Sequence, residues 1–140
     1  MGATWRFPSR FGAGLLFLVA LVAGGCDAAG AYRATLRDQT RALEELAKIL
    51  GSVTDKNSME AAGAKLDQRF GDFEGIRHRA QQLPPPTQEV LGQLREEGEK
   101  VRQALEKVQE QVRRISALPE GQKFLAGFER MHGFLGERTP

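Results

Sequence analysis

Few residues in this chain have the chemistry of a catalytic or ligand-binding group. Cys26 is the only cysteine among 140 residues, and the only histidines are His78 and His132. No serine stands in a Ser-His-acid or Gly-x-Ser-x-Gly setting, and no glycine-rich phosphate-binding motif is present. We expect His78 to be a solvated helix position and His132 to be partly buried at one end of the fold. The sequence nominates no catalytic residue, so we expect that the protein is not an enzyme.

Metal and haem binding are the sharpest alternatives to a purely structural chain. Met59 and His132 are residue types that ligate haem from different helices of a bundle, but the sequence has no Cys-x-x-Cys-His attachment motif. The carboxylates of Glu96, Glu97 and Glu99 crowd one helical turn. None of them has the histidine three residues later that carboxylate-bridged di-metal sites require. We interpret these glutamates as a solvated charged face and predict no metal site and no cofactor.

The chain begins with the three-part layout of a secretory signal peptide. Its first ten residues carry Arg6 and Arg10 and no acid, residues 11–23 are uncharged, and small residues follow. At about 1.5 Å per residue, the apolar run makes a helix of roughly 20 Å, against a hydrocarbon core of about 30 Å. We therefore predict a cleaved signal peptide over residues 1–25 rather than a membrane-spanning helix.

The end of the apolar run, Ala23, Gly24, Gly25 and Cys26, resembles the lipobox of bacterial lipoproteins. The resemblance covers only the first 26 residues, and it departs from the commonest pattern at Ala23, where the family usually has leucine. It implies that the thiol of Cys26 is the nucleophile that takes up a diacylglyceryl group before the signal is removed. It also implies that Asp27 is a sorting residue, because this position retains such proteins in the inner membrane of enteric bacteria.

Two other outcomes are open for the N-terminal segment. An ordinary signal peptidase that cuts after Gly25 or Gly30 would release a secreted or periplasmic soluble protein, and an uncleaved segment would remain as an anchor. In the lipoprotein interpretation, residues 26–31 are the lipidated cysteine and a short tether. The protein is then exported and lipid-anchored on the periplasmic side of the inner or outer membrane.

The predicted mature chain is formally neutral. Of the 20 Lys and Arg residues, Arg6 and Arg10 lie in the predicted signal, which leaves 18 against 18 Asp and Glu. A neutral chain without a basic stripe argues against nucleic-acid binding. The length suffices for one domain with a modest core, and aromatic residues are too few to indicate a large ligand pocket.

Apolar residues recur at helical spacing along the rest of the chain. The pattern predicts helices over residues 31–51, 57–82, 87–117 and 119–135, followed by a tail at residues 137–140. It is most regular in the third helix, where steps of three and four residues connect Leu91, Leu94, Gly98, Val101, Leu105, Val108, Val112 and Ile115. Such a seam indicates helix-on-helix packing.

Residues typical of helix ends support these boundaries. Asp55 or Asn57 begins the second helix, Thr87 is the N-cap of the third, and Pro119 is the first residue of the fourth. Residues 84–86 are three prolines, which end the second helix.

The second helix is predicted to be the weakest. Gly63, Gly71 and Gly75 each cost roughly 1 kcal/mol relative to alanine in a helix interior. Close packing of the backbone against a neighbouring element is the simplest explanation for glycines at these positions.

The expected fold is all-α. Three longer amphipathic helices and a short fourth pack over residues 32–136 as an antiparallel helical bundle or hairpin, because short connections favour antiparallel neighbours. In the apolar seam of the third helix, valine and isoleucine alternate with leucine and glycine. Parallel coiled-coil dimers do not favour this arrangement. We therefore expect this seam to pack within one chain.

The expected function is that of a membrane-anchored structural or interaction protein of the bacterial cell envelope. Its partners are then membrane lipid, through acylated Cys26, and another envelope protein. Phe124 and Phe128 are the candidate partner-contact residues, although their spacing equally fits a core. The alternative is a secreted helical bundle that binds a small apolar ligand or haem. The mature part also resembles uncharacterised exported helical proteins of bacteria over residues 46–55 and 59–66. This resemblance implies no particular function.

Overall fold

The computed structural model describes residues 28–132, with side chains to residue 127, and within these residues every element is a helix. The helices are α1 (Ala28–Gly51), α2 (Lys56–Gln81), α3 (Gln88–Gln93), α4 (Arg95–Ser116) and α5 (Gly121–His132). The predicted all-α class is therefore confirmed. Between residues 28 and 132, no helix combines the length and the apolar character that crossing a bilayer requires.

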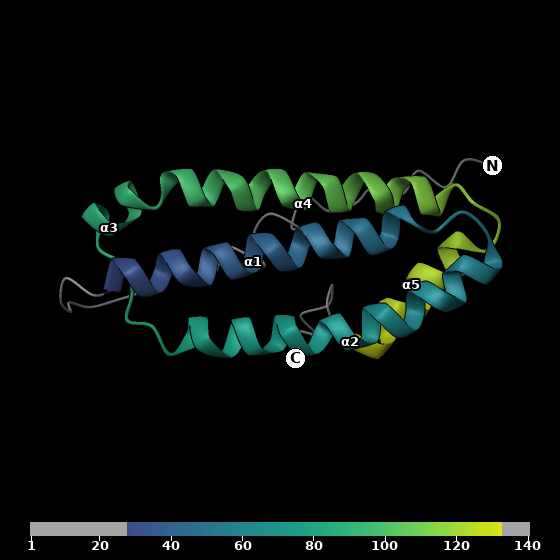
Figure 1. The fold of residues 1–140 in the computed structure, drawn as a ribbon, viewed down its shortest axis with the longest axis horizontal. Helices are drawn as coiled ribbons and strands as arrows, with labels where there is room; N and C mark the ends of the chain where they lie inside the picture. The colour runs from purple at the N-terminus through teal and green to yellow at the C-terminus, as the bar shows by residue number, and fades with distance from the viewer. Residues whose placement is uncertain (1–27, 133–140) are drawn as a thin grey trace, which may run out of the picture.

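Helix α1 lies between α2 and α4 (Figure 1). It forms an antiparallel hairpin with α2. Two ion pairs join these helices along their length: Glu45 with Arg69 at 3.0 Å and Asp38 with Arg79 at 3.1 Å. No Cα atom of α2 lies within 8 Å of a Cα atom of α4. At the end where the hairpin turns, α5 packs against both α4 and α2. The first helix is therefore the centre of the fold.

The most extensive interface in the described chain is between α1 and α4, which run parallel. Near their starts, Arg33 of α1 pairs with Glu97 of α4, and near their ends the main chain of Leu50 accepts a hydrogen bond from Arg114. The members of each pair are 64 residues apart, so the register is constant along the interface. Consecutive long helices run antiparallel as predicted, whereas the largest contact joins helices that are not consecutive.

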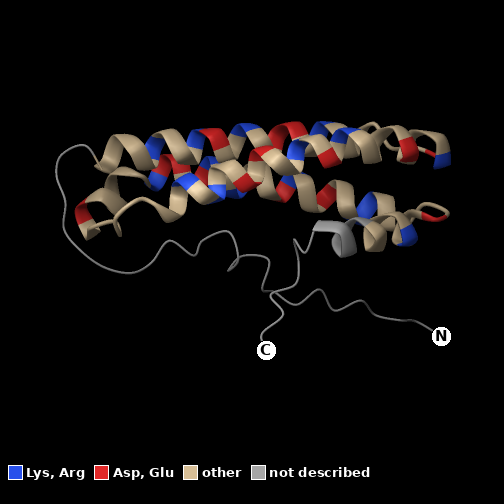
Figure 2. Cartoon of the chain, turned by 90° about the horizontal axis from the view of Figure 1, so that it is seen from below, with Lys and Arg blue, Asp and Glu red and all other residues tan. Residues whose placement is uncertain are grey.

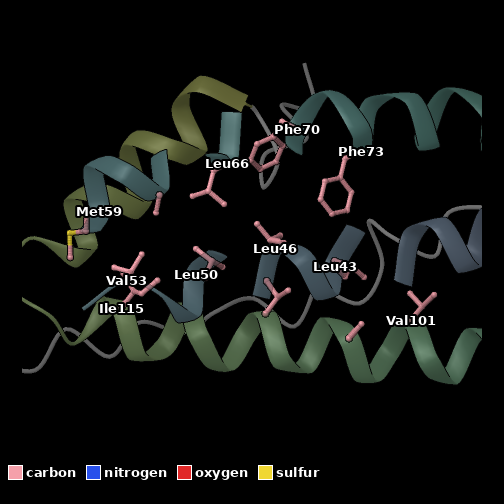
Figure 3. Packing of buried hydrophobic residues seen from close by; sticks show 13 residues of the cluster. Leu43, Leu46, Leu50, Val53, Met59, Leu66, Phe70, Phe73, Val101 and Ile115 are labelled. Carbon is pink, nitrogen blue, oxygen red and sulfur yellow. The ribbon is translucent and has the colours of Figure 1, made fainter. Parts of the chain in front are cut away.

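The core is a row of apolar side chains between α1 and its neighbours (Figure 3). Leu43 of α1, Leu66 of α2 and Ile115 of α4 are at most 1% exposed. Burying a side chain of this size contributes about 1.5 to 3 kcal/mol. The buried cluster consists of Leu43, Leu46, Leu50, Val53, Met59, Ala62, Leu66, Phe70, Phe73, Val101, Ala104, Val108 and Ile115.

Side-chain caps set the starts of two helices. The Oδ1 atom of Asp55 accepts a hydrogen bond from the Ser58 N–H at 2.8 Å, and the Asp55 N–H donates to the Ser58 Oγ at 2.9 Å. This reciprocal capping box makes Asp55, rather than Asn57, the N-cap of α2. Thr87 caps α3 as predicted, because its Oγ1 accepts from the Val90 N–H at 3.3 Å.

The helix predicted over residues 87–117 is interrupted at Leu94, which ends α3 and precedes α4. The Leu94 N–H donates to the main-chain oxygens of both Val90 and Leu91, a tightened last turn that Gly92 makes easier. The interruption buries the Leu94 side chain, while Leu91, one turn earlier, is 41% exposed. A single straight helix would have carried both leucines on the same face.

The fourth predicted helix starts two residues later than expected. Pro119 is not its first residue but lies in a turn, in which the Gly121 N–H donates to the Leu118 oxygen at 3.0 Å. Glu120 in this turn has a φ of 62°. A Cβ at Gly121 would lie 1.7 Å from the main-chain oxygen of Ile115. Glycine is therefore required where α5 folds back against the end of α4.

The glycines of α2 do not mark a close helix contact, contrary to the expectation from the sequence. A Cβ built at Gly63 or Gly71 would meet no atom within 4 Å, and one at Gly75 would meet only the end of the Arg79 side chain at 3.8 Å. These glycines therefore weaken α2 without improving its packing.

Candidate functional site

The predicted lipidation site lies just before the described residues. Cys26 and Asp27 are outside them, and α1 begins at Ala28. Residues 28–31, expected to be part of a tether, belong to the first turns of α1 instead. At most one residue, Asp27, therefore separates the candidate lipid attachment point from a helix that is anchored in the core.

The candidate partner-contact residues are on α5. Phe124 is partly buried and packs against the hydrophobic core, and the side chain of Phe128 lies outside the described residues. Of the residue pair considered for haem, Met59 is buried in the core at 4% exposure, and the side chain of His132 also lies outside the described residues. The described part of α5 thus uses Phe124 to close the core.

Two of the three clustered glutamates lie on a solvated face, as predicted. Glu96 pairs with Lys100 at 2.6 Å, and Glu99 pairs with Arg102. Hydrogen bonds from these partners lower the pKa of Glu96 and of Glu99 below the ordinary value. Figure 2 shows such charges of both signs along the length of the helices.

Glu97 is the exception, and the prediction that it is solvated is wrong. It is only 7% exposed, and its Oε1 lies 3.0 Å from the Nε of Arg33 and 3.7 Å from a terminal nitrogen of Arg37. Thr35 and Gln39 are also buried on this part of α1. A carboxylate buried between two helices requires a cation beside it, and α1 supplies two. Sequence reasoning missed this polar layer at the α1–α4 interface.

A signal for the burial of Glu97 is present in the sequence. Leu94, just before α4, and Glu97, Val101, Ala104 and Val108 within it are buried, at steps of three and four. Leu94, Val101 and Val108 also belong to the predicted seam. Between them, the buried residues are Glu97 and Ala104, each one residue before the predicted Gly98 and Leu105. Because leucine occupies one of these two predicted positions, hydrophobicity alone selected the wrong series.

Tyr32 lies at the same end of the interface, one residue before Arg33. It is 3% exposed, and its hydroxyl has no hydrogen-bond partner among the described residues. Burial raises the pKa of this hydroxyl above 10.0. The start of α1 therefore holds several buried polar groups, whereas the opposite end of the fold is packed mainly with apolar side chains.

An open groove of about 330 Å³ runs between α1 and α2. Small and apolar residues from both helices line it together with three arginines and three acidic residues: Asp38, Arg41, Ala42, Glu45, Arg69, Gly71, Asp72, Gly75, Ile76 and Arg79. Arg69 pairs with Glu45 across the groove at 3.0 Å and with Asp72 on its own helix at 3.0 Å. Its mixed charge suits a polar or amphipathic protein segment, and its lining holds no cysteine, serine or histidine.

The described residues bring no catalytic constellation together. Within residues 28–127, no three His, Cys, Asp or Glu side chains converge in a way that could hold a metal ion. Among the described residues, the fold offers a charged helical surface, the groove between α1 and α2 and a helix that starts beside the candidate lipidation site. Comparison of the chain with protein-family models, with curated proteins and with solved structures finds no match.

Proposed function

We propose that this protein is a lipid-anchored helical interaction protein of the bacterial cell envelope. Acylated Cys26 holds the bundle at a membrane surface on the periplasmic side, and the helices offer a binding surface to another envelope protein. The protein acts by tethering, because confinement to a membrane raises its effective concentration for a partner in the same membrane. It performs no chemistry of its own.

The short distance between Cys26 and α1 is the observation that carries this proposal. A lipid on Cys26 is attached, through Asp27 alone, to a helix whose stripe of leucines forms the centre of the core. A lipoprotein that searched a large volume would need a long flexible linker. Here the anchor restrains the position and tilt of the whole bundle, which suits a protein that docks onto a neighbour at a defined height.

The α1–α2 groove is the surface that we propose for the partner. Arg41 and the ion pairs of Arg79 with Asp38 and of Asp72 with Arg69 give its lining charges of both signs, which a partner segment of mixed charge can match. A Cβ at Gly71 would meet no atom within 4 Å, so a partner can approach the backbone of α2 closely there. Phe124, the contact residue suggested by the sequence, is committed in part to the core.

Metabolic labelling tests the anchor. The full-length chain and Cys26→Ala are expressed in a bacterium with radioactive palmitate, and the label, mass and membrane fraction of each product are measured. We expect a labelled, membrane-bound wild type and an unlabelled variant that leaves the membrane fraction. Asp27→Asn, which keeps the thiol, is the matched control and must keep its label. An unlabelled, soluble wild type would contradict the proposal.

The same cells test the proposed sorting role of Asp27. Inner and outer membranes of an enteric host are separated on a density gradient, and the labelled protein is quantified in each. We expect wild type in the inner membrane and Asp27→Ser in the outer membrane. The same distribution for both proteins would exclude sorting by Asp27 without affecting the anchor.

Site-directed photo-crosslinking in living cells tests the partner surface. A photoreactive residue replaces Gly71 in the groove or Gln103 on the exposed outer face of α4. We expect a discrete crosslink to one envelope protein from position 71, and loss of that crosslink when Cys26→Ala is added. A crosslink of equal yield from position 103 would show that the groove is not the docking surface.

A further inference from the structure

The segment that connects α2 to α4, at the end of the bundle where α1 begins, carries almost no charge. Between Arg79, in the last turn of α2, and Arg95, at the start of α4, Glu89 is the single charged residue. We call residues 80–94 the end cap: it comprises the last residues of α2, the proline-containing loop, α3 and Leu94. In Figure 2 the end that carries α3 is mostly tan, whereas red and blue alternate along the helices.

The end cap also holds an apolar tip. Leu91 is the large hydrophobic residue that stands exposed among the described side chains. Leu83, Pro85 and Val90 beside it in the chain are only partly buried. The interruption of the helix at Leu94 turns Leu91 away from the core. Burial of this tip in the headgroup region of a membrane would remove apolar surface from water, which is favourable.

The candidate lipid is attached at this same end. Cys26 is two residues before Ala28, so their Cα atoms are at most roughly 7 Å apart. Helix α1 contacts α3 here, and Arg33 in its second turn pairs with Glu97 in the first turn of α4. Whatever membrane holds the acyl chains is therefore within reach of the end cap.

We propose that the end cap rests on the surface of the lipid bilayer, with Leu91 among the headgroups and α1 rising away from the membrane. This inference rests on the proposed acylation of Cys26. Exposed arginines border the end cap on both sides, with Arg77 before it and Arg95 after it. Arg79 is paired with Asp38 on α1, and Glu96, the acid beside Arg95, is paired with Lys100. Such a border pairs with the phosphates of a membrane surface and adds attraction where the lipids are anionic.

The long faces of the bundle fit a bilayer poorly. The outer face of α4 carries the ion pairs of Arg102 with Glu99 and Glu106, and α2 carries that of Arg69 with Asp72. A bundle that lay flat would bring such charges into the interface, where their desolvation costs free energy. Residues 80–94, which an end-on bundle brings to the membrane, contain a single acid, Glu89. At about 1.5 Å per residue, the 24 residues of α1 would lift the α1–α2 turn roughly 35 Å above the end cap.

Depth-dependent quenching tests this orientation on the lipidated full chain. Because Cys26 is the only cysteine and acylation occupies its sulfur, a second cysteine is the only free thiol. Leu91→Cys in the end cap, Gln103→Cys on the outer face of α4 and Ser52→Cys in the α1–α2 turn are each labelled with a nitrobenzoxadiazole dye. The proteins are reconstituted into vesicles of phosphatidylethanolamine and phosphatidylglycerol, with nitroxide placed on the lipid headgroups. All three positions are exposed, and circular dichroism checks that each variant is folded.

We expect nitroxide lipids to quench most of the fluorescence at position 91 and to leave that at positions 103 and 52 unchanged. Equal quenching at positions 91 and 103 means a bundle that lies flat, and it overturns the inference. An unquenched position 91 on protein that floats with the vesicles also overturns the inference. In that case the end cap faces water or, if sedimentation shows a dimer, a second copy of the chain. These two results leave the proposed anchor intact, whereas a chain that carries no lipid and does not float overturns both proposals.

Discussion

The guanidinium of Arg114, on α4, donates a hydrogen bond to the main-chain oxygen of Val53 at 2.7 Å across 61 residues of sequence. It also donates to the oxygens of Leu50 at 2.8 Å and Gly51 at 3.4 Å. The last carbonyls of a helix have no partner inside it and carry partial negative charge. One arginine thus caps the end of α1 from the parallel helix and fixes the register between them.

Replacing this cap will destabilise the fold. Arg114→Met keeps the aliphatic stem but removes the donor to the Val53 carbonyl and leaves the Leu50 carbonyl with only the Val53 N–H. We expect the free energy of unfolding to fall by about 2 kcal/mol, because hydrogen bonds from charged donors contribute about 1.5 to 3 kcal/mol. Urea unfolding measures it. Arg113→Met, on the exposed side of the same turn, is the control and should change stability by less than about 0.5 kcal/mol. Equal effects would refute the capping role.

At the other end of the interface, removal of Arg33 will cost more than removal of Arg37. Arg33→Met leaves the buried carboxylate of Glu97 with only the more distant Arg37, whose side chain is 68% exposed. We expect a loss of about 1 to 3 kcal/mol for Arg33→Met and under about 1 kcal/mol for Arg37→Met. Thermal or urea unfolding of both variants measures the difference.

A double variant separates the charge from the packing. Glu97→Leu added to Arg33→Met removes the uncompensated carboxylate and fills its place with an apolar side chain, so it should restore part of the lost stability. If the double variant is as unstable as the sum of the two single variants, the salt bridge is not the cause.

Two glycines of α2 are expected to be replaceable at a gain. Gly63→Ala and Gly71→Ala place a Cβ in open space and remove a flexible residue from a helix interior. Each should raise the free energy of unfolding by about 0.5 to 1 kcal/mol. Gly121→Ala is the opposite case, since its Cβ would collide with the Ile115 oxygen, and it should lower stability by about 1 to 3 kcal/mol. Denaturant titrations that rank the three differently would contradict this account of α2.

The capping box of α2 will make stability depend on pH in the acid range. Hydrogen bonds donated by Ser58 hold the pKa of Asp55 below its ordinary value of 3.8. A carboxyl whose pKa is lower in the folded state stabilises the fold above its unfolded pKa, and this contribution is lost as pH falls through the folded pKa. Melting temperatures should therefore decline from about pH 4 downward.

Asp55→Asn isolates that contribution. Asparagine caps a helix but does not titrate in this range, so the variant should lose less stability than wild type between pH 4 and pH 2. Glu60→Gln removes an exposed carboxylate further along α2 without touching the cap, and it should retain the acid-range decline. Parallel curves for wild type and Asp55→Asn would show that the cap carries no such linkage.

Much of the local structure was predictable from the sequence. The leucine stripe of α1, the cap at Thr87 and the helical nature of each segment depend on residues within one or two turns of one another. The end of α2 before the prolines is also local, because proline cannot continue a helical hydrogen-bond ladder. The lipidation site at Cys26 also depends only on neighbouring residues, but it lies outside the described residues and stays a prediction.

Pairing between helices was decided by the tertiary structure. Periodicity shows that α4 has an apolar stripe, but it does not show that the stripe faces the parallel α1 rather than the preceding α2. That choice depends on contacts between residues 64 apart, such as Arg33 with Glu97. The packing of α4 against α1 also buries Glu97, although the sequence places it in a charged turn. Its burial is tolerated because Arg33 and Arg37 of α1 lie beside the carboxylate.

The sequence alone was enough to predict that residues 28–132 are mainly helical and to place the apolar stripe of α1, since both follow from side-chain types within a few residues. The export signal stays a prediction. Only the tertiary structure decided that α1 is central, that Arg114 caps it, and that the chain bends at Leu94 so that Leu91 faces outward. The physical reason is that local patterns set which face of a helix avoids water. The partner that covers this face is selected by the packing of all the helices together.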